Sequence, residues 1–552
     1  MRWLAVGLLF TVGAIVLTWP LAVQLQSGIP LGTETVATVP LFNLWTLAWN
    51  VESVSRSYEG YWQAPIFHPA PHTFALSEPQ PLTGLAAAAL SWVVGSVLGA
   101  YNLLLLLALI TNALCAAILL RAAGLRWLPA VAGGGLVLVL PFTHQELGVI
   151  QLVPLAGVFL FALVAFRFAA EPSWRKGLLL GSALFLAYAL SAQIAVFAVL
   201  AGGPALIFYL APRLRERQAW EGLVVAAGLF LVLASPLILA QRQATSGEGY
   251  ERSAETMRKH SAQPSHYLKS AWPMLVPTPG IETADRPSRR AFWPGTLRVL
   301  LALGALIAAW RHPTWRRLAV CGAFLLVTSQ LFSWVAHMEV GSFPFLSLLR
   351  SVPGLSQIRS YFRFALFVQL AVVGLAALAL ELLLRWSEKR WKKEQSLAFV
   401  AAIALVAVVE VRPTMGEIQP LPSMEAELPW LSWITENTEQ DDVLAFVPFP
   451  EGRSARDYLT TAQSMYWQMR HWRPMVNGYS GFFPDSFRDL KDAMQTFPSQ
   501  KSLQALRDAD VRYCIIPRAV IERSPAPDPN GAVQLLRAYQ DEQNSIAIFE
   551  LR

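Results

Sequence analysis

Charge and cysteine are both scarce in this chain. Charged residues make up only 15% of its 552 residues, whereas hydrophobic residues make up 54%. The chain is therefore too apolar to be a soluble protein of this length. Its three cysteines, Cys115, Cys321 and Cys514, lack the spacing of a metal or redox site, and only Cys514 lies outside the long apolar runs, which excludes a disulfide framework. With neither an internal repeat nor a low-complexity tract, the composition predicts a membrane protein.

Long apolar runs with almost no charge recur along the chain. Most approach the roughly 20 residues with which a helix crosses a bilayer, so we predict eleven transmembrane helices. They cover residues 3–25, 100–120, 127–142, 152–166, 177–190, 194–211, 219–240, 299–310, 318–335, 364–384 and 396–411. A further apolar stretch, 81–97, would invert every later loop if it spanned, so we expect it to lie in or dip into the outer interface.

The loops between these runs are asymmetric in basic charge. With the N-terminus inside, the inner loops carry clusters of Arg and Lys, for example in RWSEKRWKK from residue 385, whereas the outer loop 26–80 holds only Arg56. Basic residues accumulate on the cytoplasmic side, so we predict a cytoplasmic N-terminus. The net charge of +7 then reflects a cytoplasmic collar that contacts anionic lipid headgroups, and it does not call for nucleic acid.

The polar parts lie on the outer side. They are the loops 26–98, 242–298 and 336–362 and the tail from 412, which contains strand patterns at DDVLAFVPF, VRYCIIP and SIAIFEL and helical periodicity at 455–470 and 486–508. We therefore predict a transmembrane domain, 1–411, and an extracytoplasmic α/β domain, 412–552. The aromatic residues of RPMVNGYSGFFPDS could face a ligand or pack this domain onto the membrane part.

Glu34 is the first candidate catalytic residue. It stands alone among apolar and hydroxyl residues, shortly before VPLFNLWTLAWN, whose 3.6-residue period predicts an amphipathic helix at the outer membrane surface. Trp45 and Trp49 would mark its interfacial side. A carboxylate held there could take a proton from an incoming hydroxyl, or it could simply solvate the loop.

Glu78 occupies a similar position in the proline-rich stretch FHPAPHTFALSEPQPLTG, residues 67–84. The prolines disfavour helix and predict a rigid entry that returns Glu78, His68 and His72 to the membrane face. The two histidines are four residues apart, but the prolines between them prevent the shared helical face that a metal pair would use.

Further polar groups fall at the outer ends of spans. THQELGVIQLVP places His144, Glu146 and Gln151 there, where a polar cavity or a short solvated turn would accommodate them. In VPGLSQIRSYFRFALF, Arg359 and Arg363 are four residues apart, which predicts one helical face and a clamp for a phosphate. The alternative is that both arginines extend to lipid phosphates.

The order of these parts resembles the superfamily C glycosyltransferases (GT-C), integral membrane enzymes that use polyprenyl-phosphate-linked sugars. Shared features are a first span, a large first outer loop with an acidic residue and surface helices, many further spans and an outer C-terminal domain. More closely, nearly the whole chain is similar to an uncharacterised group of bacterial membrane proteins of that superfamily. The likeness lies in VPLFNLWTLAWN, APIFHPAPHTFALSEPQPLTGL, LGVIQLVPL, VPGLSQIRSYFRF and RPMVNGYSGFFP.

The resemblance implies an all-α polytopic fold and a transferase that moves a sugar from a polyprenyl-phosphate donor to an acceptor hydroxyl on a glycan, lipid or protein. It implies Glu34, with Glu78 as the second choice, as the catalytic carboxylate, and Arg359 or Arg363 as the phosphate clamp. Further substrate-binding candidates are Asn43, His68, His144 and Gln151. The expected location is the bacterial inner membrane. No cofactor follows from the residues, and a divalent metal requirement stays open.

The chain departs from this group at one point. Many relatives have a Gly-Asp pair directly before the Pro-Leu-x-Asn segment, whereas this chain has Thr38 and Val39, and its acid lies five residues earlier. An alternative therefore stays open, in which a chain with this fold binds or transports a lipid-linked glycan without catalysis.

Overall fold

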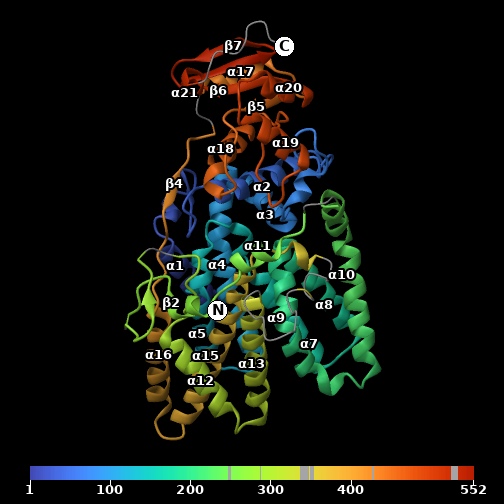
Figure 1. The fold of residues 1–552 in the computed structure, drawn as a ribbon. Helices are drawn as coiled ribbons and strands as arrows, with labels where there is room; N and C mark the ends of the chain where they lie inside the picture. The colour runs from blue at the N-terminus through green and yellow to red at the C-terminus, as the bar shows by residue number, and fades with distance from the viewer. Residues whose placement is uncertain are drawn as a thin grey trace. The chain divides into compact units, whose positions relative to one another are not determined.

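The computed structural model describes residues 1–246, 250–275, 277–285, 288–335, 347, 354–424, 428–523 and 533–552. These residues form two compact units. Unit 1 comprises Met1–Gln24, Leu103–Ser235 and Glu248–Ile418, and unit 2 comprises Leu25–Asn102, Pro236–Gly247 and Gln419–Arg552. Figure 1 shows the elements of both. The expected outer loop 336–362 falls largely outside the described residues.

Unit 1 is almost entirely helical. Its helices are α1 (Arg2–Leu17), α5 (Trp127–Leu138), α6 (Pro141–Gln145), α7 (Ala156–Ala170), α8 (Trp174–Leu190), α9 (Ala192–Leu210), α11 (Ala254–Lys259), α12 (Thr296–Ala309), α13 (Pro313–Trp334), α15 (Ala365–Ser387) and α16 (Lys393–Val409). Two more, α4 (Val97–Ala122) and α10 (Arg217–Ala244), have residues in both units. The short strands β2 (Lys269–Ser270) and β3 (Glu282–Thr283) pair in parallel.

Each of the eleven apolar runs contains a helix, as predicted. Among the described residues, seven helical segments are long and apolar enough to cross a membrane: Val97–Ala122, Trp127–Gln145, Ile150–Ala170, Ala192–Arg213, Arg217–Ala244, Pro313–Trp334 and Tyr361–Ser387. Shorter apolar helices are α1, α3 (Pro81–Val94) and α12. A membrane protein is therefore confirmed, while a count of eleven crossings stays a prediction.

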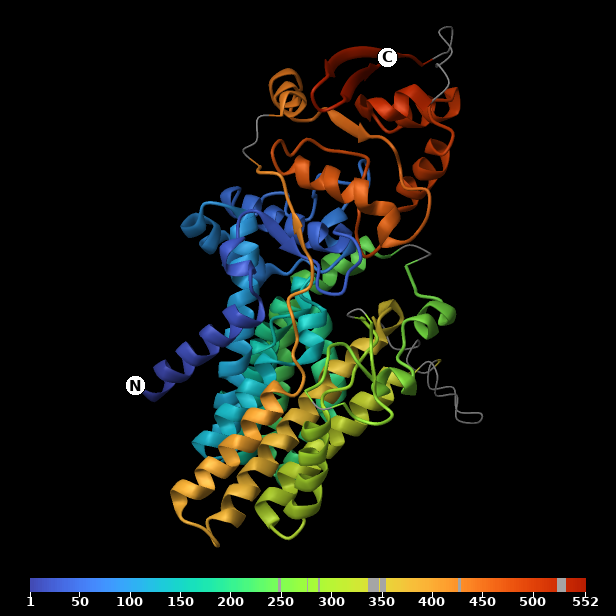
Figure 2. The ribbon, with the colours of Figure 1, turned by 90° about the vertical axis from the view of Figure 1, so that its left-hand side faces the viewer.

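Helix α15 is the most buried of the candidate spans. It packs against α12, α13, α5 and α16, and most of its residues are buried. Figure 2 shows the antiparallel α15–α16 hairpin in gold and orange. Alanines recur along α15, and small residues allow helices in a membrane to pack closely against one another.

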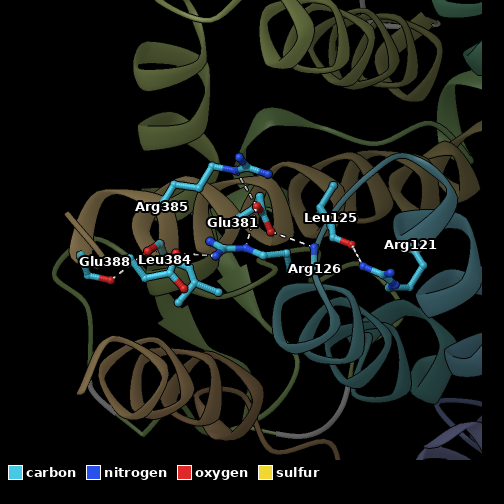
Figure 3. A network of polar contacts seen from close by, with 8 residues as sticks. Arg121, Leu125, Arg126, Glu381, Leu384, Arg385 and Glu388 are labelled. Carbon is cyan, nitrogen blue, oxygen red and sulfur yellow. Dashed lines mark hydrogen bonds and ion pairs between the residues drawn. The ribbon is translucent and has the colours of Figure 1, made fainter. Parts of the chain in front are cut away.

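A polar network ties the end of α15 to the loop between α4 and α5 (Figure 3). The buried Glu381 carboxylate accepts from the Arg126 backbone N–H at 2.9 Å, from Arg126 Nε at 3.0 Å and from Arg385 Nε at 2.7 Å. Arg126 also pairs with Glu388 at 2.6 Å. These arginines belong to the expected cytoplasmic collar, and the structure gives them protein partners, which offset the cost of burying the Glu381 charge.

Unit 2 combines the first long loop with the tail. Its elements are β1 (Gly28–Pro30), α2 (Thr38–Ser55), α3, β4 (Ile418–Pro420, whose first residue belongs to unit 1), α17 (Pro429–Asn437), β5 (Val443–Phe446), α18 (Leu459–Gln468), α19 (Asp485–Met494), α20 (Gln500–Asp508), β6 (Val511–Pro517), α21 (Arg518–Arg523), β7 (Leu535–Asp541) and β8 (Ile546–Leu551). Four strands form a sheet in the order β5-β6-β8-β7. The β5–β6 pair is parallel, and β6–β8 and β7–β8 are antiparallel.

The predicted tail strands and helices are all present as β5, β6, β8, α18, α19 and α20. The sequence prediction missed β7, an edge strand with mostly exposed or half-buried residues. Such a strand lacks the strict alternation that identifies a half-buried strand. The division into domains at residues 411 and 412 stays a proposal.

Helix α2 differs from the expected amphipathic surface helix. Nearly every residue from Thr38 to Asn50 is buried, by α3, α18 and β1 among others. Trp45 donates from Nε1 to Gln468 Oε1 at 3.0 Å, and Trp49 donates from Nε1 to the Tyr61 carbonyl at 2.9 Å. The polar side of α2, with Asn43, Thr46 and Asn50, is buried together with its apolar side, so the prediction of a one-sided membrane-surface helix is wrong.

The aromatic residues of RPMVNGYSGFFPDS pack within unit 2. Tyr479 contacts Phe42 of α2 edge-on at 5.5 Å between ring centroids, and Phe483 contacts Phe67 at 5.8 Å. The proline-rich stretch runs beside this segment, because the Phe67 and His68 N–H groups donate to the Asn477 and Met475 carbonyls. Both motifs therefore contribute to one core.

Candidate functional site

Unit 1 contains a group of basic side chains that we call the cationic cluster. Its members are Lys259, His260, Arg289, Arg290, Arg359 and Arg363. They come from the end of α11, from the segment before α12 and from the segment before α15. The Phe362 N–H donates to the His260 carbonyl at 3.1 Å, and Arg290 Nη2 donates to the Lys259 carbonyl. These bonds fix the three segments to one another.

Phe362 contacts two members of the cluster. The guanidinium carbons of Arg289 and Arg363 lie 5.8 and 6.0 Å from its ring centroid, within the range of cation–π attraction. Phe292 stacks on Phe362 at 6.1 Å. The ring therefore contributes a cation–π contact to each of these two guanidinium groups.

Glu146 supplies the carboxylate of this site. Its side chain is 1% exposed and accepts two bonds from Arg289, at 3.0 Å from Nε and 2.8 Å from Nη2. Burial alone would raise the pKa of Glu146, but the charge and hydrogen bond of Arg289, with the charge of Arg363, hold that pKa below its usual value. The solvated-turn interpretation is therefore wrong for Glu146.

His260 reports the electrostatic character of the cluster. Burial, and then the positive charges of Arg359, Arg290, Lys259 and Arg289, lower the pKa of His260 to about 4. The imidazole is therefore neutral near pH 7. Further positive charge is disfavoured there, so the same location favours an anion.

Arg359 and Arg363 join the cluster, but they do not share a helical face. Arg359 lies outside any helix, and Arg363 lies in the 3-10 turn Tyr361–Phe364, before α15 begins at Ala365. The prediction of one helical face is wrong because both arginines precede the first residue of α15. Arg363 Nη1 instead donates to Gln193 Oε1 at the start of α9.

Two other candidates of unit 1 lie near span ends. His144 is buried in α6, with Nε2 at 2.9 Å from the Leu138 carbonyl and its ring 6.4 Å from that of Trp272, edge to face. Gln151 is half-buried in a 3-10 turn before α7. Their role in substrate binding stays a prediction.

The candidates of the first loop lie in unit 2. Glu34 is half-buried in a tight turn before α2, in which its N–H donates to the Leu31 carbonyl at 2.9 Å. Asn43 is buried in α2, where its Oδ1 accepts from Gln80 Nε2 at 3.1 Å and its Nδ2 donates to the Val39 carbonyl. Asn43 therefore contacts the residues that lead into α3.

Glu78 and His68 have different surroundings from Glu34. Glu78 lines a depression with Trp45, Phe74 and Ser480 that is too narrow to hold a water molecule. His68 Nε2 lies 3.9 Å from Asp510, and burial lowers the pKa of His68 despite this acidic neighbour. In the described part of the chain, no three His, Cys, Asp or Glu side chains gather in a way that could hold a metal ion.

Sequence reasoning missed His260, Arg289 and Arg290 as members of the site. A signal was available, because RKH at 258–260 and RR at 289–290 fall in the expected outer loop 242–298, where the charge asymmetry predicts few basic residues. Basic pairs that contradict that rule are candidates for binding.

Solved structures share this architecture. Arabinofuranosyltransferase AftD from Mycobacteria matches with a TM-score of 0.59 and 13% identity, over 100% of this chain and 40% of AftD. The chain has the GT-C fold. It spans less than half the length of AftD.

Two further structures resemble this chain more distantly. Archaeal oligosaccharyltransferase AglB from Archaeoglobus fulgidus, in complex with an inhibitory peptide and a dolichol-phosphate, matches at a TM-score of 0.49 and 11% identity, over 94% of this chain and 70% of AglB. ArnT from Cupriavidus metallidurans, bound to undecaprenyl phosphate, matches at 0.49 and 11%, over 98% and 97%. The fold assignment rests on AftD. No protein-family model and no curated protein match the chain.

Proposed function

We propose that this chain is a membrane glycosyltransferase that moves a sugar from a polyprenyl-phosphate donor to an acceptor hydroxyl on the outer face of a bacterial inner membrane. The observation that carries the proposal is the cationic cluster in a GT-C fold. Two guanidinium groups at the Phe362 ring, with Arg359, Arg290 and Lys259 near His260, suit a phosphate, because charge-assisted bonds from guanidinium groups are strong and can be bidentate.

The proposed reaction assigns a role to each group. The acceptor hydroxyl attacks the anomeric carbon, and its proton passes to Glu34 or, as the alternative, to Glu78. The bond between that carbon and the phosphate oxygen breaks, and the electron pair leaves with the lipid phosphate. Arg359 and Arg363 stabilise this leaving group.

The donor site is tested with a short-chain polyprenyl phosphate. We expect Arg359→Gln/Arg363→Gln to weaken its binding to the purified protein, measured by titration calorimetry in detergent, by at least about tenfold, because two charge-assisted contacts are lost. The matched control is Arg215→Gln/Arg217→Gln, two exposed arginines of the same unit. Equal affinity in wild type and both double variants would remove the phosphate site.

The carboxylate is tested by transfer in reconstituted membranes. Loss of a general base lowers rates by roughly 10²–10⁴-fold, so either Glu34→Gln or Glu78→Gln should do so while polyprenyl-phosphate binding persists. Glu59→Gln, an exposed glutamate of the same loop, is the control. Full transfer in both variants would refute the assignment.

The non-catalytic alternative rests on positions 38 and 39, where this chain has no carboxylate. A protein that binds the polyprenyl phosphate through the cationic cluster but transfers no sugar from any polyprenyl-linked donor would support that alternative over the enzyme.

A further inference from the structure

Unit 2 contains a cleft whose residues have no assigned role in the reaction described above. The cleft is open and has a volume of about 440 Å³. Tyr58, Tyr61 and Trp62 line it, with Gln63 and His72 beside them and Pro236 and Leu237 on the other side. We call it the aromatic cleft. Its volume falls within the range of about 300–1,000 Å³ that small-molecule sites occupy.

The rings of the aromatic cleft are held in place. Tyr61 donates from its hydroxyl to Asn50 Oδ1 at 2.9 Å, and its ring contacts Phe74 at 5.0 Å and Trp62 at 4.8 Å. Tyr58 contacts Tyr61 at 5.4 Å. A ligand therefore meets a platform that is already ordered, which reduces the entropic cost of binding.

The side chains of Gln63 and His72 keep hydrogen-bonding capacity for a ligand. The His72 N–H donates to Gln63 Oε1 at 2.9 Å, which directs the Gln63 amide. His72 Nδ1 is buried and has no hydrogen-bond partner in the part of the chain that the structure describes. A buried ring nitrogen without a partner is costly. His72 is half-buried and lines the cleft, so a ligand hydroxyl that reaches its ring would reduce this cost.

The backbone around the cleft is strained. Ser57, Tyr58 and His72 have φ values of 54°, 62° and 53°, in the left-handed region that non-glycine residues rarely adopt. Such strained conformations tend to cluster at ligand sites.

We propose that the aromatic cleft binds a saccharide. Aromatic faces pack against the C–H face of a sugar ring, while an amide and an imidazole bond its hydroxyls. The polar side chains of Gln63 and His72 favour a sugar over an isoprenoid chain, which would exclude water from the Gln63 amide nitrogen and the imidazole without replacing its hydrogen bonds. If the proposed transferase function holds, this saccharide is the acceptor, and the acceptor class is then a glycan.

The test uses methyl glycosides of glucose, galactose, mannose and arabinose with the full chain in a sugar-free detergent. Saturation-transfer difference NMR would detect binding. We expect Trp62→Ala to weaken it about tenfold, as for the loss of one aromatic contact, and Gln63→Ala, a change at an exposed side chain, to weaken it as well. Trp92→Ala, at a fully accessible tryptophan of the same unit, should leave it unchanged.

Two results would overturn the proposal. One is glycoside binding that is absent from the wild type or equal in wild type and both cleft variants. The other is loss of short-chain polyprenyl-phosphate binding in Trp62→Ala, which would make the cleft a lipid site. Failure of the transferase proposal looks different, because polyprenyl-phosphate binding and transfer would then be absent while Trp62-dependent glycoside binding persists.

Discussion

At the scale of single residues, Glu146 and His471 show how burial sets charge. Glu146 keeps its negative charge in unit 1 because Arg289 donates two bonds to it. His471, in unit 2, loses its positive charge because burial and the charges of Arg473 and Arg470 lower its pKa to about 3. Glu146 reduces the net positive charge of the cationic cluster, and His471 makes the free energy of unfolding depend on pH.

Glu146→Gln should strengthen anion binding while lowering stability. The change removes the carboxylate that accepts two bonds from Arg289, so the cluster becomes more positive and two charge-assisted bonds inside the protein are weakened. We expect short-chain polyprenyl phosphate to bind several-fold tighter in calorimetry and the apparent melting temperature to fall. Glu171→Gln, at an exposed acid of the same unit, should change neither. Weaker binding in Glu146→Gln would show that the carboxylate positions Arg289 for the ligand.

His471→Asn should flatten the dependence of stability on pH. An unfolded histidine titrates near 6.5, and the folded pKa is about 3, so the folded state binds fewer protons in between. Stability is then complete above pH 6.5 and falls as pH drops towards 3, at up to about 1.4 kcal/mol per pH unit. Asn preserves an acceptor for the Arg473 N–H, which Nδ1 accepts at 3.0 Å. Melting temperatures from pH 7.5 to 4.5 would check this, and His312→Gln, at an exposed site, should retain the wild-type slope.

At the scale of elements, the contact between α2 and α3 depends on one small residue. A Cβ on Gly84 of α3 would lie 2.3 Å from Asn50 Cγ of α2. Asn50 cannot easily move, because Nδ2 donates to the Thr46 and Pro79 carbonyls and Oδ1 accepts from Tyr61. The two helices therefore approach closely only because residue 84 has no side chain.

Gly84→Ala should destabilise unit 2 by about 1–3 kcal/mol, the usual cost of overpacking. Gly228→Ala is the control, because Gly228 in α10 has open space where the Cβ would lie. Thermal unfolding of both variants would separate the two cases. An unchanged melting temperature in Gly84→Ala would mean that α2 and α3 can move apart at little cost.

The elements also show what a sequence can and cannot predict. Apolar length identified helices such as α4 and α15, and β-branched runs identified β5 and β6, because both signals are local. The environment of α2 is not a local property, because Gln468, far along the chain, contacts Trp45. The local sequence shows only the amphipathic period of α2, which suggested a surface helix. The sequence predicted part of the cationic cluster, because Arg359 and Arg363 lie at the end of an apolar run. Arg289 was not predicted, because its pairing with Glu146 is visible only in the structure.

At the scale of the whole molecule, the charge asymmetry gives a testable orientation. We expect Glu451→Cys, in a background in which the three native cysteines are replaced by alanine, to react with an impermeant maleimide in intact cells. Lys393→Cys should react only after permeabilisation, because Lys393 is the last residue of the basic cluster assigned to the cytoplasm. Both residues are exposed. The reverse pattern would invert the proposed topology.

The bond between Trp45 and Gln468 has a consequence for synthesis. Its partners are 423 residues apart, and a ribosome adds roughly 5–20 residues per second, so α2 waits roughly 20–85 s for α18 to be made. During that interval a helix rich in tryptophan, phenylalanine and leucine has left the ribosome without the partner that covers it. Biogenesis of this protein therefore includes a period of exposure to proteases and to wrong partners, and a membrane-associated chaperone that shields α2 would raise the yield of folded protein.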